Sequence, residues 1–324
     1  MPIAVVLGST GSQGKGVIDA LLKDPKWTLR GICRNRNSAT ALELSEKGVE
    51  MVDGDVGDEE FLLKAFTGAD AIFAITAYWH LLGPRDIDQA GEEEFRQLQS
   101  IAIAASKTET LNHFVLSTIP SAELMSNGEH PVPHFDYKNK AVQWMKVHTN
   151  KLYEITTYVY VALYPNNFVN EAFMRFVKVR PGGYFLLLPA SPTAVMPFSG
   201  EITHNIGVVV DAILAAPEKT IGRTVPLHTD HATFTEVVAL FEKVTGQTAV
   251  YSEVSDESFE HLYGPLFGRE LVLGLRFHEK YPSEDLNDLP PLGTGTLMTL
   301  EELGVGDRVI GLEGAMKGFG DKLL

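Results

Sequence analysis

The chain has 324 residues, of which 44% are hydrophobic, so it is long and apolar enough for a sizeable core and is not a wholly disordered protein. Its 27 Lys and Arg against 42 Asp and Glu give a net charge of −15, which disfavours direct binding to nucleic acid or to an anionic membrane. Cys33 is the only cysteine, which excludes an intramolecular disulfide and a cysteine-based zinc site.

The apolar runs of the sequence indicate neither a targeting segment nor a membrane span. The first eight residues form a short apolar run that leads into a glycine turn, without the basic start and longer apolar stretch of a signal peptide. Residues 158–163, the longest strongly apolar run, fall far short of the roughly 18 residues that a spanning helix needs. We therefore expect a cytoplasmic protein, or a nuclear one if it acts as a regulator.

The first half of the chain alternates short β-rich runs with longer helical patterns. We predict strands at residues 3–7, 28–33, 49–52, 70–75, 113–117 and 155–162. Helices are predicted between them, at residues 15–23, 39–47, 59–66, 88–106 and 135–148. Apolar strands joined by amphipathic helices form right-handed βαβ units, which predicts an α/β fold with a Rossmann-type, doubly wound parallel sheet.

The second half contains Pro and Gly more often and has helical patterns at residues 202–215, 233–245 and 256–263. From this change we predict a Rossmann domain over residues 1–164 and a smaller C-terminal α+β lobe over residues 165–324, interwoven with the sheet. Such a lobe is expected to cover the carboxyl ends of the strands, where open α/β sheets bind their ligands.

A glycine-rich turn directly after the first predicted strand is the strongest chemical signal. Gly8, Gly11 and Gly14 form a G-x-x-G-x-x-G pattern that opens the first predicted helix. Glycine permits positive φ and close backbone approach, and the helix start offers free N–H groups to a pyrophosphate. The pattern predicts a dinucleotide site, with a purely structural turn as the alternative.

The end of the second predicted strand carries basic rather than acidic residues. NAD-selective sites place an acidic residue there, on the ribose 2′-OH. Arg34, with Arg36 nearby, instead offers a guanidinium to a 2′-phosphate, which favours NADP(H) unless both arginines are simply solvated. After the third predicted strand, Asp55 is the candidate for the adenine amino group, whereas Asp58 is expected to cap the next helix.

These features resemble the NmrA-like family of atypical short-chain dehydrogenase relatives, which includes fungal nitrogen-control regulators, NADPH sensors and isoflavone-reductase-like proteins. The resemblance covers most of the chain. Beyond the glycine turn, it rests on Cys33-Arg34-Asn35, Gly54-Asp55-Val56-Gly57-Asp58, Thr76-Ala77-Tyr78-Trp79, Ser117, His134-Phe135-Asp136-Tyr137-Lys138, Pro165-Asn166-Asn167-Phe168-Val169-Asn170 and Val195-Met196-Pro197. It implies a Rossmann-type domain that binds NADP(H), and a small C-terminal lobe that forms a cleft.

The resemblance also implies which residues contact the cofactor. The residues that would hold the pyrophosphate are Gly8, Thr10, Gly11, Ser12, Gln13 and Gly14. The residues toward the adenosine are Arg34 at the 2′-phosphate, Asp55 and Val56. The residues toward the nicotinamide are Thr76, Ala77 and Tyr78 along its path, Lys138 at the ribose and Asn167 where the cleft closes.

The catalytic pattern of short-chain dehydrogenases is only partly present. Those enzymes use Tyr-x-x-x-Lys, which places a phenol and an ammonium on one helical face. Here His134 stands four residues before Lys138, and Tyr137 would point about 100° away from the lysine on an ideal helix. The sensor-type relatives also carry basic residues near positions 83–94, where this chain is acidic.

Four residues are candidates for proton transfer. Lys138 is the first, by resemblance to isoflavone-reductase-like proteins, and its alternative role is to anchor the nicotinamide ribose. Tyr78, His134 and Tyr137 are the others, each with a structural alternative. The remaining histidines have no ligand spacing, so we expect no metal site.

Two functions agree with this pattern. The first is an oxidoreductase that transfers hydride between NADP(H) and a small organic carbonyl, enone or imine. The second is a non-catalytic NADP(H) redox sensor that signals through a regulated protein partner. In either case we expect a monomer or homodimer.

Overall fold

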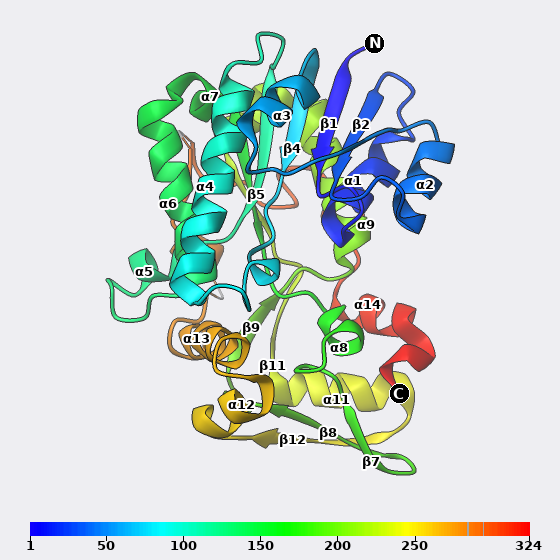
Figure 1. Cartoon of the computed structure of the whole chain (residues 1–324). Coiled ribbons are helices and arrows are strands. Elements are labelled where there is room, and N and C mark those ends of the chain that lie inside the picture. Colours follow the sequence, from blue (N-terminus) through cyan, green and yellow to red (C-terminus); the bar gives the residue numbers. More distant parts are fainter. Residues whose placement is uncertain (284, 294) are drawn as a thin grey trace.

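The computed structural model describes residues 1–283, 285–293 and 295–324. Its main feature is a parallel sheet of seven strands (Figure 1). In chain order these strands are β1 (Ile3–Leu7), β2 (Thr28–Cys33), β3 (Glu50–Asp53), β4 (Ala69–Ala74), β5 (His113–Thr118), β6 (Thr156–Val161) and β10 (Thr224–Leu227). Their order in the sheet is β10-β6-β5-β4-β1-β2-β3. Successive strands are therefore added on one side of β1 up to β3 and on its other side from β4 onward, so the strand order reverses between β1 and β4 although all strands are parallel. The predicted Rossmann-type, doubly wound sheet is confirmed.

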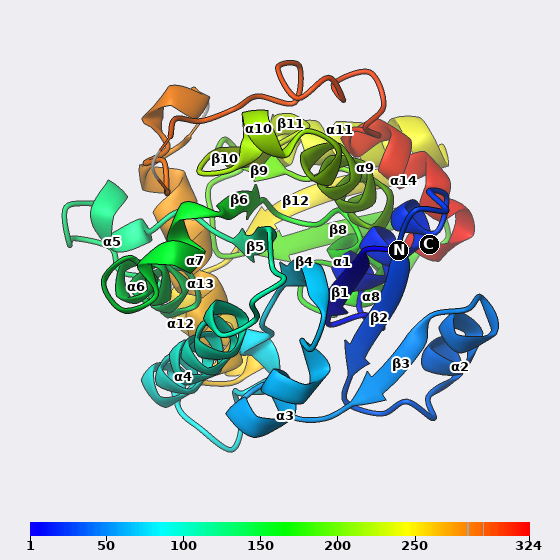
Figure 2. The ribbon, with the colours of Figure 1, turned by 90° about the horizontal axis from the view of Figure 1, so that it is seen from above.

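Helices cover both faces of the sheet, as the view from above shows (Figure 2). The helices on one face are α3 (Glu59–Ala65), α4 (Ile87–Ser106), α6 (Pro133–His148) and α7 (Asn150–Glu154). The helices on the other face are α1 (Ser12–Leu21), α2 (Ala39–Glu46) and α9 (Ile202–Ala215). Alternation along β1 explains both layers, since Val5 and Leu7 pack toward the first group and Ala4 and Val6 toward the second.

The smaller lobe is built on a three-stranded sheet and lies beyond the carboxyl ends of the parallel strands (Figure 1). Its strands are β7 (Val177–Arg180), β8 (Gly183–Leu188) and β12 (Thr248–Glu253), together with the antiparallel pair β9 (Val195–Phe198) and β11 (Asp230–Thr233). Its helices are α8 (Asn167–Asn170), α11 (Phe234–Thr245), α12 (Asp256–Tyr263), α13 (Phe267–Lys280) and α14 (Leu312–Phe319). Parallel β8–β12 and antiparallel β7–β8 pairing give the predicted α+β lobe.

Short segments complete the chain. They are η1 (Tyr78–His80), α5 (Ala122–Met125), α10 (Pro217–Thr220), η2 (Leu286–Asp288) and η3 (Gly320–Leu323). Among the described residues, no helix has both the length and the apolar character needed to cross a membrane.

The chain passes between sheet and lobe more than once. Helix α9 and strand β10 follow residue 164, yet they complete one face and one edge of the parallel sheet. The hydrogen bonds Leu163 N–H to Pro197 O (3.1 Å) and Ser199 N–H to Leu163 O (3.0 Å) then tie the end of β6 to β9 of the lobe. The carboxyl edge of the sheet and the lobe are therefore held together by covalent and hydrogen-bonded connections.

Candidate functional site

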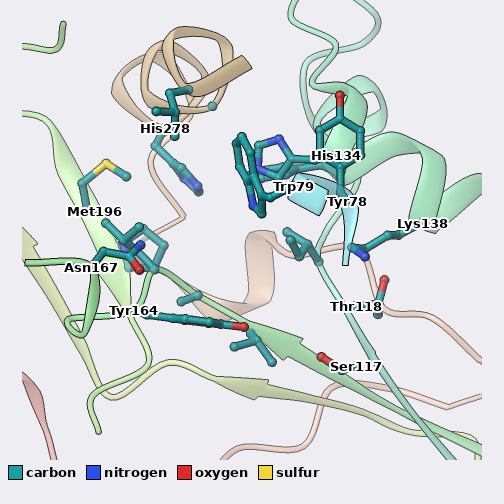
Figure 3. A pocket seen from close by; sticks show the side chains of 18 of the residues that line it. Tyr78, Trp79, Ser117, Thr118, His134, Lys138, Tyr164, Asn167, Met196 and His278 are labelled. Atoms are coloured by element: carbon teal, nitrogen blue, oxygen red, sulfur yellow. The ribbon is translucent and has the colours of Figure 1, made fainter. Parts of the chain in front are cut away.

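A cavity of about 450 Å³ lies between the carboxyl ends of the parallel strands and the lobe. It begins at Ser12 and Gln13 of α1 and continues past the ends of β4, β5 and β6. Its far wall is formed by α13, with His278 facing Trp79 and His134 across the opening (Figure 3). The cavity therefore includes the reversal point of strand order, where doubly wound sheets bind their ligands.

Two positions of the glycine turn, Gly8 and Gly14, require glycine, one for its backbone conformation and one for close packing. Gly8 has a φ of +63°, a conformation that side chains disfavour, and a Cβ on Gly14 would lie 2.3 Å from the Gly8 carbonyl oxygen. Gly11 precedes α1, and no described side chain caps that helix. The N–H groups of its first turn are therefore available to an anion, as the sequence predicts.

Gln13 leads from this turn into the cavity. Its Nε2 donates to the hydroxyl of Tyr164 at 2.5 Å, while its buried Oε1 has no hydrogen-bond partner in the described parts of the chain. Because an unsatisfied buried acceptor is costly, this atom fits a ligand that supplies a donor. Ser12 also lines the cavity, and Thr10 is half-buried in the turn.

Arg34 lies exposed at the carboxyl end of β2, beside the cavity rim. Its Nη2 is 3.4 Å from Nε2 of His80, which lines the cavity. Burial, and next the charge of Arg34, lower the pKa of His80. Arg36 contacts Asp53 at 3.5 Å, whereas no described carboxylate pairs with Arg34. Of these two arginines, Arg34 is thus the one without a carboxylate partner in the described parts of the chain.

Two aspartates in the loop after β3 have different environments: Asp58 caps a helix, and Asp55 is the candidate for the adenine amino group. Asp58 caps α3 by accepting from the N–H groups of Glu60 (3.0 Å) and Phe61 (3.1 Å), which confirms that prediction. Asp55 accepts from the Gly57 N–H at 2.8 Å and is otherwise exposed. Val56 packs on the core of the sheet.

Lys138 is held in a buried polar cluster with Glu94 and Thr76. Its ammonium donates to Glu94 Oε1 and, at 3.0 Å, to Thr76 Oγ1, which itself donates to Glu94 Oε1 at 2.8 Å. Glu94 is 0% and Lys138 is 8% exposed. An ammonium has three N–H donors, so one remains for a ligand in the cavity that Lys138 and Thr76 line.

His134 lies one helical turn before Lys138 on α6 and has its own buried carboxylate. Glu270 Oε1 of α13 accepts from the His134 backbone N–H at 2.8 Å and lies 2.5 Å from its Nδ1. Glu270 is 0% exposed. The His134 ring packs against Trp79, with ring centroids 4.8 Å apart, and lines the cavity.

The two tyrosine candidates are placed differently from the lysine. The Tyr78 hydroxyl donates to the Ile87 carbonyl oxygen at 2.8 Å, and burial, followed by the charge of Glu270, raises its pKa. Tyr137 is not among the described residues that line the cavity. Its ring packs on α4, where a Cβ on Gly91 would lie 2.1 Å from Tyr137 Cδ2. The structure therefore does not bring Tyr137 to the site, in line with the 100° offset expected from an ideal helix.

The lobe end of the cavity is aromatic and apolar. Trp79 packs edge-on against Phe267 at 5.2 Å, and Asn167 and Met196 stand opposite (Figure 3). Burial lowers the pKa of the cavity residues His228 and His278 to about 3 and about 4. Both imidazoles are therefore neutral at pH 7. Among the described residues, no group of three or more His, Cys, Asp or Glu is arranged to hold a metal ion.

Three contributors to the site were not predicted from the sequence. Glu94 and Glu270 each supply a buried carboxylate, and Tyr164 bonds Gln13 across the floor of the cavity. Each contact joins residues far apart in the chain, 44 positions for Lys138 with Glu94 and 136 for His134 with Glu270. No local signal in the sequence marks these pairs.

Comparison with known proteins identifies the relatives of this chain. The model of the NmrA-like family matches residues 3–291. An NmrA-like family domain-containing oxidoreductase of Aspergillus hancockii is 29% identical, over 84% of this chain and 82% of the relative. An NmrA-like family domain-containing protein of Dictyostelium discoideum is 26% identical, over 86% and 87%.

Solved structures show the same fold. The negative transcriptional regulator NmrA in complex with NADP has a TM-score of 0.74 at 20% identity, over 100% of this chain and 99% of the other. The Citrobacter sp. triphenylmethane reductase complexed with NADP(H) has a TM-score of 0.72 at 21% identity, over 98% and 99%. Together with the family match over nearly the whole sequence, this establishes that the chain belongs to the NmrA-like family.

Proposed function

We propose that this chain binds NADP(H) and uses it to transfer hydride to or from a small, uncharged organic carbonyl, enone or imine. One observation carries the proposal. A single cavity joins the open N-terminus of α1, the Lys138–Glu94–Thr76 cluster and an apolar wall of the lobe. These are the three environments that a pyrophosphate, a ribose with its nicotinamide and an organic substrate need.

The cofactor fits the residues at the start of the cavity. The first turn of α1 and the unpaired Oε1 of Gln13 supply polar groups for the dinucleotide, and Arg34 supplies the cation for a 2′-phosphate. Asp55, Val56, Ala77 and Asn167 remain proposed contacts along its length. The NADP and NADP(H) complexes of the structural neighbours support the same cofactor here.

The chemistry divides between the cofactor and the chain. NADPH, when bound, supplies the hydride. The remaining N–H of Lys138 is available to a ribose hydroxyl. The positive charge of Lys138 stabilises negative charge that develops nearby on the substrate. Phe173, Met174 and Leu275 line the lobe side with apolar surface that excludes water from the reacting atoms.

The lining also restricts the substrate. Among the described residues around the cavity, and leaving histidines aside, only Lys138 and Glu171 carry a charge. Since Lys138 is already paired with Glu94, an anionic substrate would find no unpaired Lys or Arg among these lining residues. A volume of about 450 Å³, shared with the nicotinamide, leaves room for a small molecule only.

The test is a turnover screen in which the oxidation of NADPH is monitored by its absorbance. Benzaldehyde, cyclohexenone, phenanthrenequinone and dihydroisoquinoline represent the carbonyl, enone, quinone and imine classes. We expect NADPH oxidation with at least one of them, and less than a tenth of that rate with NADH. Tight NADPH binding without turnover of any compound would contradict the oxidoreductase role.

That negative outcome would favour the second candidate, a non-catalytic NADP(H) sensor. The observation behind it is that His134 occupies the position where short-chain dehydrogenases have their tyrosine. Tyr78 does not replace that tyrosine, because its hydroxyl is committed to the Ile87 carbonyl and its pKa is raised.

A further inference from the structure

One carboxylate oxygen of Glu270 contacts two nitrogen atoms of His134, the backbone nitrogen and Nδ1 of the ring. Its Oε1 accepts from the His134 backbone N–H and is in hydrogen-bond contact with Nδ1. A carboxylate only accepts, so the proton of a neutral His134 ring must be on Nδ1. Nε2 is then the atom that can gain or lose a proton. In the described parts of the chain, no hydrogen bond reaches Nε2.

A glycine keeps the Nε2 edge of the ring uncovered. A Cβ on Gly274 of α13 would lie 3.4 Å from His134 Cε1 and 4.0 Å from Nε2, which is ordinary contact. Gly274 does not have a positive φ, and glycine weakens the interior of a helix relative to alanine. Neither the backbone nor close packing requires glycine there. Its effect is to leave the Nε2 edge open to the cavity that both residues line.

The ring is also fixed and placed next to the cofactor cluster. Trp79 and Tyr78 pack on it, with ring centroids at 4.8 and 5.7 Å. His134 and Lys138 are four residues apart on α6 and therefore share one face. Figure 3 shows both side chains on the same side of the cavity, opposite His278 and Asn167.

We infer that His134 is the catalytic residue that exchanges a proton with the substrate through Nε2, and that Glu270 is the positioning residue that fixes the orientation and the tautomer of its ring. The inference rests on the proposed oxidoreductase function. In the reduction of a carbonyl, the carbon receives the hydride of NADPH, which becomes NADP⁺, and the oxygen receives the Nε2 proton of the imidazolium, which becomes the neutral imidazole. The carbonyl π bond breaks, an alcohol forms, and the imidazole takes a proton back from water.

The charged and titratable groups around His134 agree with this role. Glu270 and His278 face it from α13, Tyr78 from η1, and Lys138 lies one turn along α6. Glu270 is the group in direct hydrogen-bond contact with the ring. Because burial lowers the pKa of His278, that ring stays neutral and does not oppose the charge on His134.

The first test is spectroscopic and needs no substrate. In the ¹⁵N-labelled full chain with NADPH, two-bond ¹H–¹⁵N correlations report which ring nitrogen carries the proton. In the neutral form of the His134 ring we expect the proton on Nδ1 and a bare Nε2, assigned by loss of its signals in His134→Gln. A neutral ring that carries its proton on Nε2 instead would overturn the inference.

The second test is kinetic, with benzaldehyde and NADPH as the probe reaction. We expect His134→Gln to lower kcat about a hundredfold with unchanged NADPH affinity, as for loss of a general acid. Glu270→Gln keeps an Oε1 acceptor and loses the charge, so the pH above which kcat falls should move down by about 1–3 pH units. An unmoved pH profile, or kcat of His134→Gln within twofold of the original, would refute the role of the pair.

Gly274→Ala tests access to Nε2 without removing any functional group. Alanine should raise the melting temperature or leave it unchanged, yet lower kcat, because its methyl group covers the ring edge. The matched control is Gly318→Ala in α14, where no described atom lies within 4 Å, and there kcat should not change. If Gly274→Ala keeps full kcat, the open edge is not used. If the unsubstituted chain turns over none of the four screened compounds, the proposed function fails and this inference with it.

Discussion

Lys138 and Glu94 form a buried ion pair that is shielded from water. Glu94 is fully buried, and both charged groups bond to Thr76. Removing one partner of such a pair leaves an uncompensated buried charge, whereas neutral replacement of both is often tolerated. The cluster is therefore a strongly coupled unit in which Lys138 keeps one fixed position at the cavity.

This coupling can be measured by chemical unfolding. Lys138→Met should lower the free energy of unfolding by about 3–5 kcal/mol, because Glu94 is left buried and unpaired. Adding Glu94→Gln should restore most of that loss, since an amide carries no charge and still bonds to Thr76. Strictly additive losses in the single and double variants would contradict the coupling.

Arg34 is expected to select the phosphorylated cofactor. Arg34→Ala should weaken NADPH binding by about 1.5–3 kcal/mol, the range for hydrogen bonds to charged groups, and leave NADH binding unchanged. Calorimetric titration with both dinucleotides is the measurement. Arg36→Ala is the matched control, because that arginine already contacts Asp53. Equal weakening of NADPH and NADH by Arg34→Ala would refute the assignment.

The buried histidines predict how stability depends on pH. Burial lowers the pKa of His278 from 6.5 in the unfolded chain to about 4, and of His228 to about 3. At a pH between the folded-state pKa and the unfolded-state pKa of 6.5, the unfolded chain binds more protons than the folded chain. The free energy of unfolding therefore falls as the pH drops below about 6. The slope is roughly 1.4 kcal/mol per pH unit for each histidine. Urea titrations of His278→Gln should show a shallower slope, and an unchanged slope would contradict the prediction.

The residues that the sequence revealed are those whose role is local. The glycine turn and Asp58 as a cap each follow from neighbours within a few positions, whereas Lys138 was expected from the resemblance to the NmrA-like family. Glu94 stands in an acidic run that is typical of a solvated face, and only the fold shows that it points inward to Lys138. Buried carboxylates of this kind depend on tertiary contacts, so composition and spacing cannot identify them.

At the scale of elements, the crossing of α1 and α9 fixes the position of the glycine turn. A Cβ on Gly16 would lie 1.9 Å from the Thr203 carbonyl oxygen, and a Cβ on Gly207 would lie 2.3 Å from the Gly16 carbonyl oxygen. The two backbones therefore touch directly, which only glycine permits. Since α1 begins at the glycine turn, its contact with α9 sets where the first N–H groups lie.

Substitution at this crossing should damage stability. Gly16→Ala and Gly207→Ala are each expected to lower the free energy of unfolding by about 1–3 kcal/mol or more, because the helices must move apart. Gly318→Ala is the control in an open helical position and should be neutral or slightly stabilising. Thermal unfolding compares the three. A melting temperature for Gly16→Ala equal to that of the control would show that the crossing is not tight.

The elements differ in how well their sequence predicts them. Strands β1, β2, β4, β5 and β6 are buried runs, and the predicted ranges lie within about one residue of the observed ones. Strand β7 is exposed along its whole length and β12 along most of it, so neither has the apolar signal on which the prediction relies. Helix α1 starts at Ser12, earlier than the predicted residue 15, because the turn leads into it without a spacer.

At the scale of the molecule, the cavity exists because the lobe returns to the carboxyl edge of the sheet. The lobe supplies α13 with Glu270, Gly274 and His278, while the sheet domain supplies the glycine turn and Lys138. The predicted cleft was thus found, but one of its polar pairs, His134 with Glu270, joins the two parts and follows from neither part alone.

NADPH binding in the cavity is tested most simply by a crystal structure of the chain with this dinucleotide. We expect the pyrophosphate on the first turn of α1, the 2′-phosphate at Arg34 and the nicotinamide ribose at Lys138, with space for a substrate beside His134. A dinucleotide bound away from this cavity, or crystals saturated with NADPH that show none in it, would contradict the proposed function.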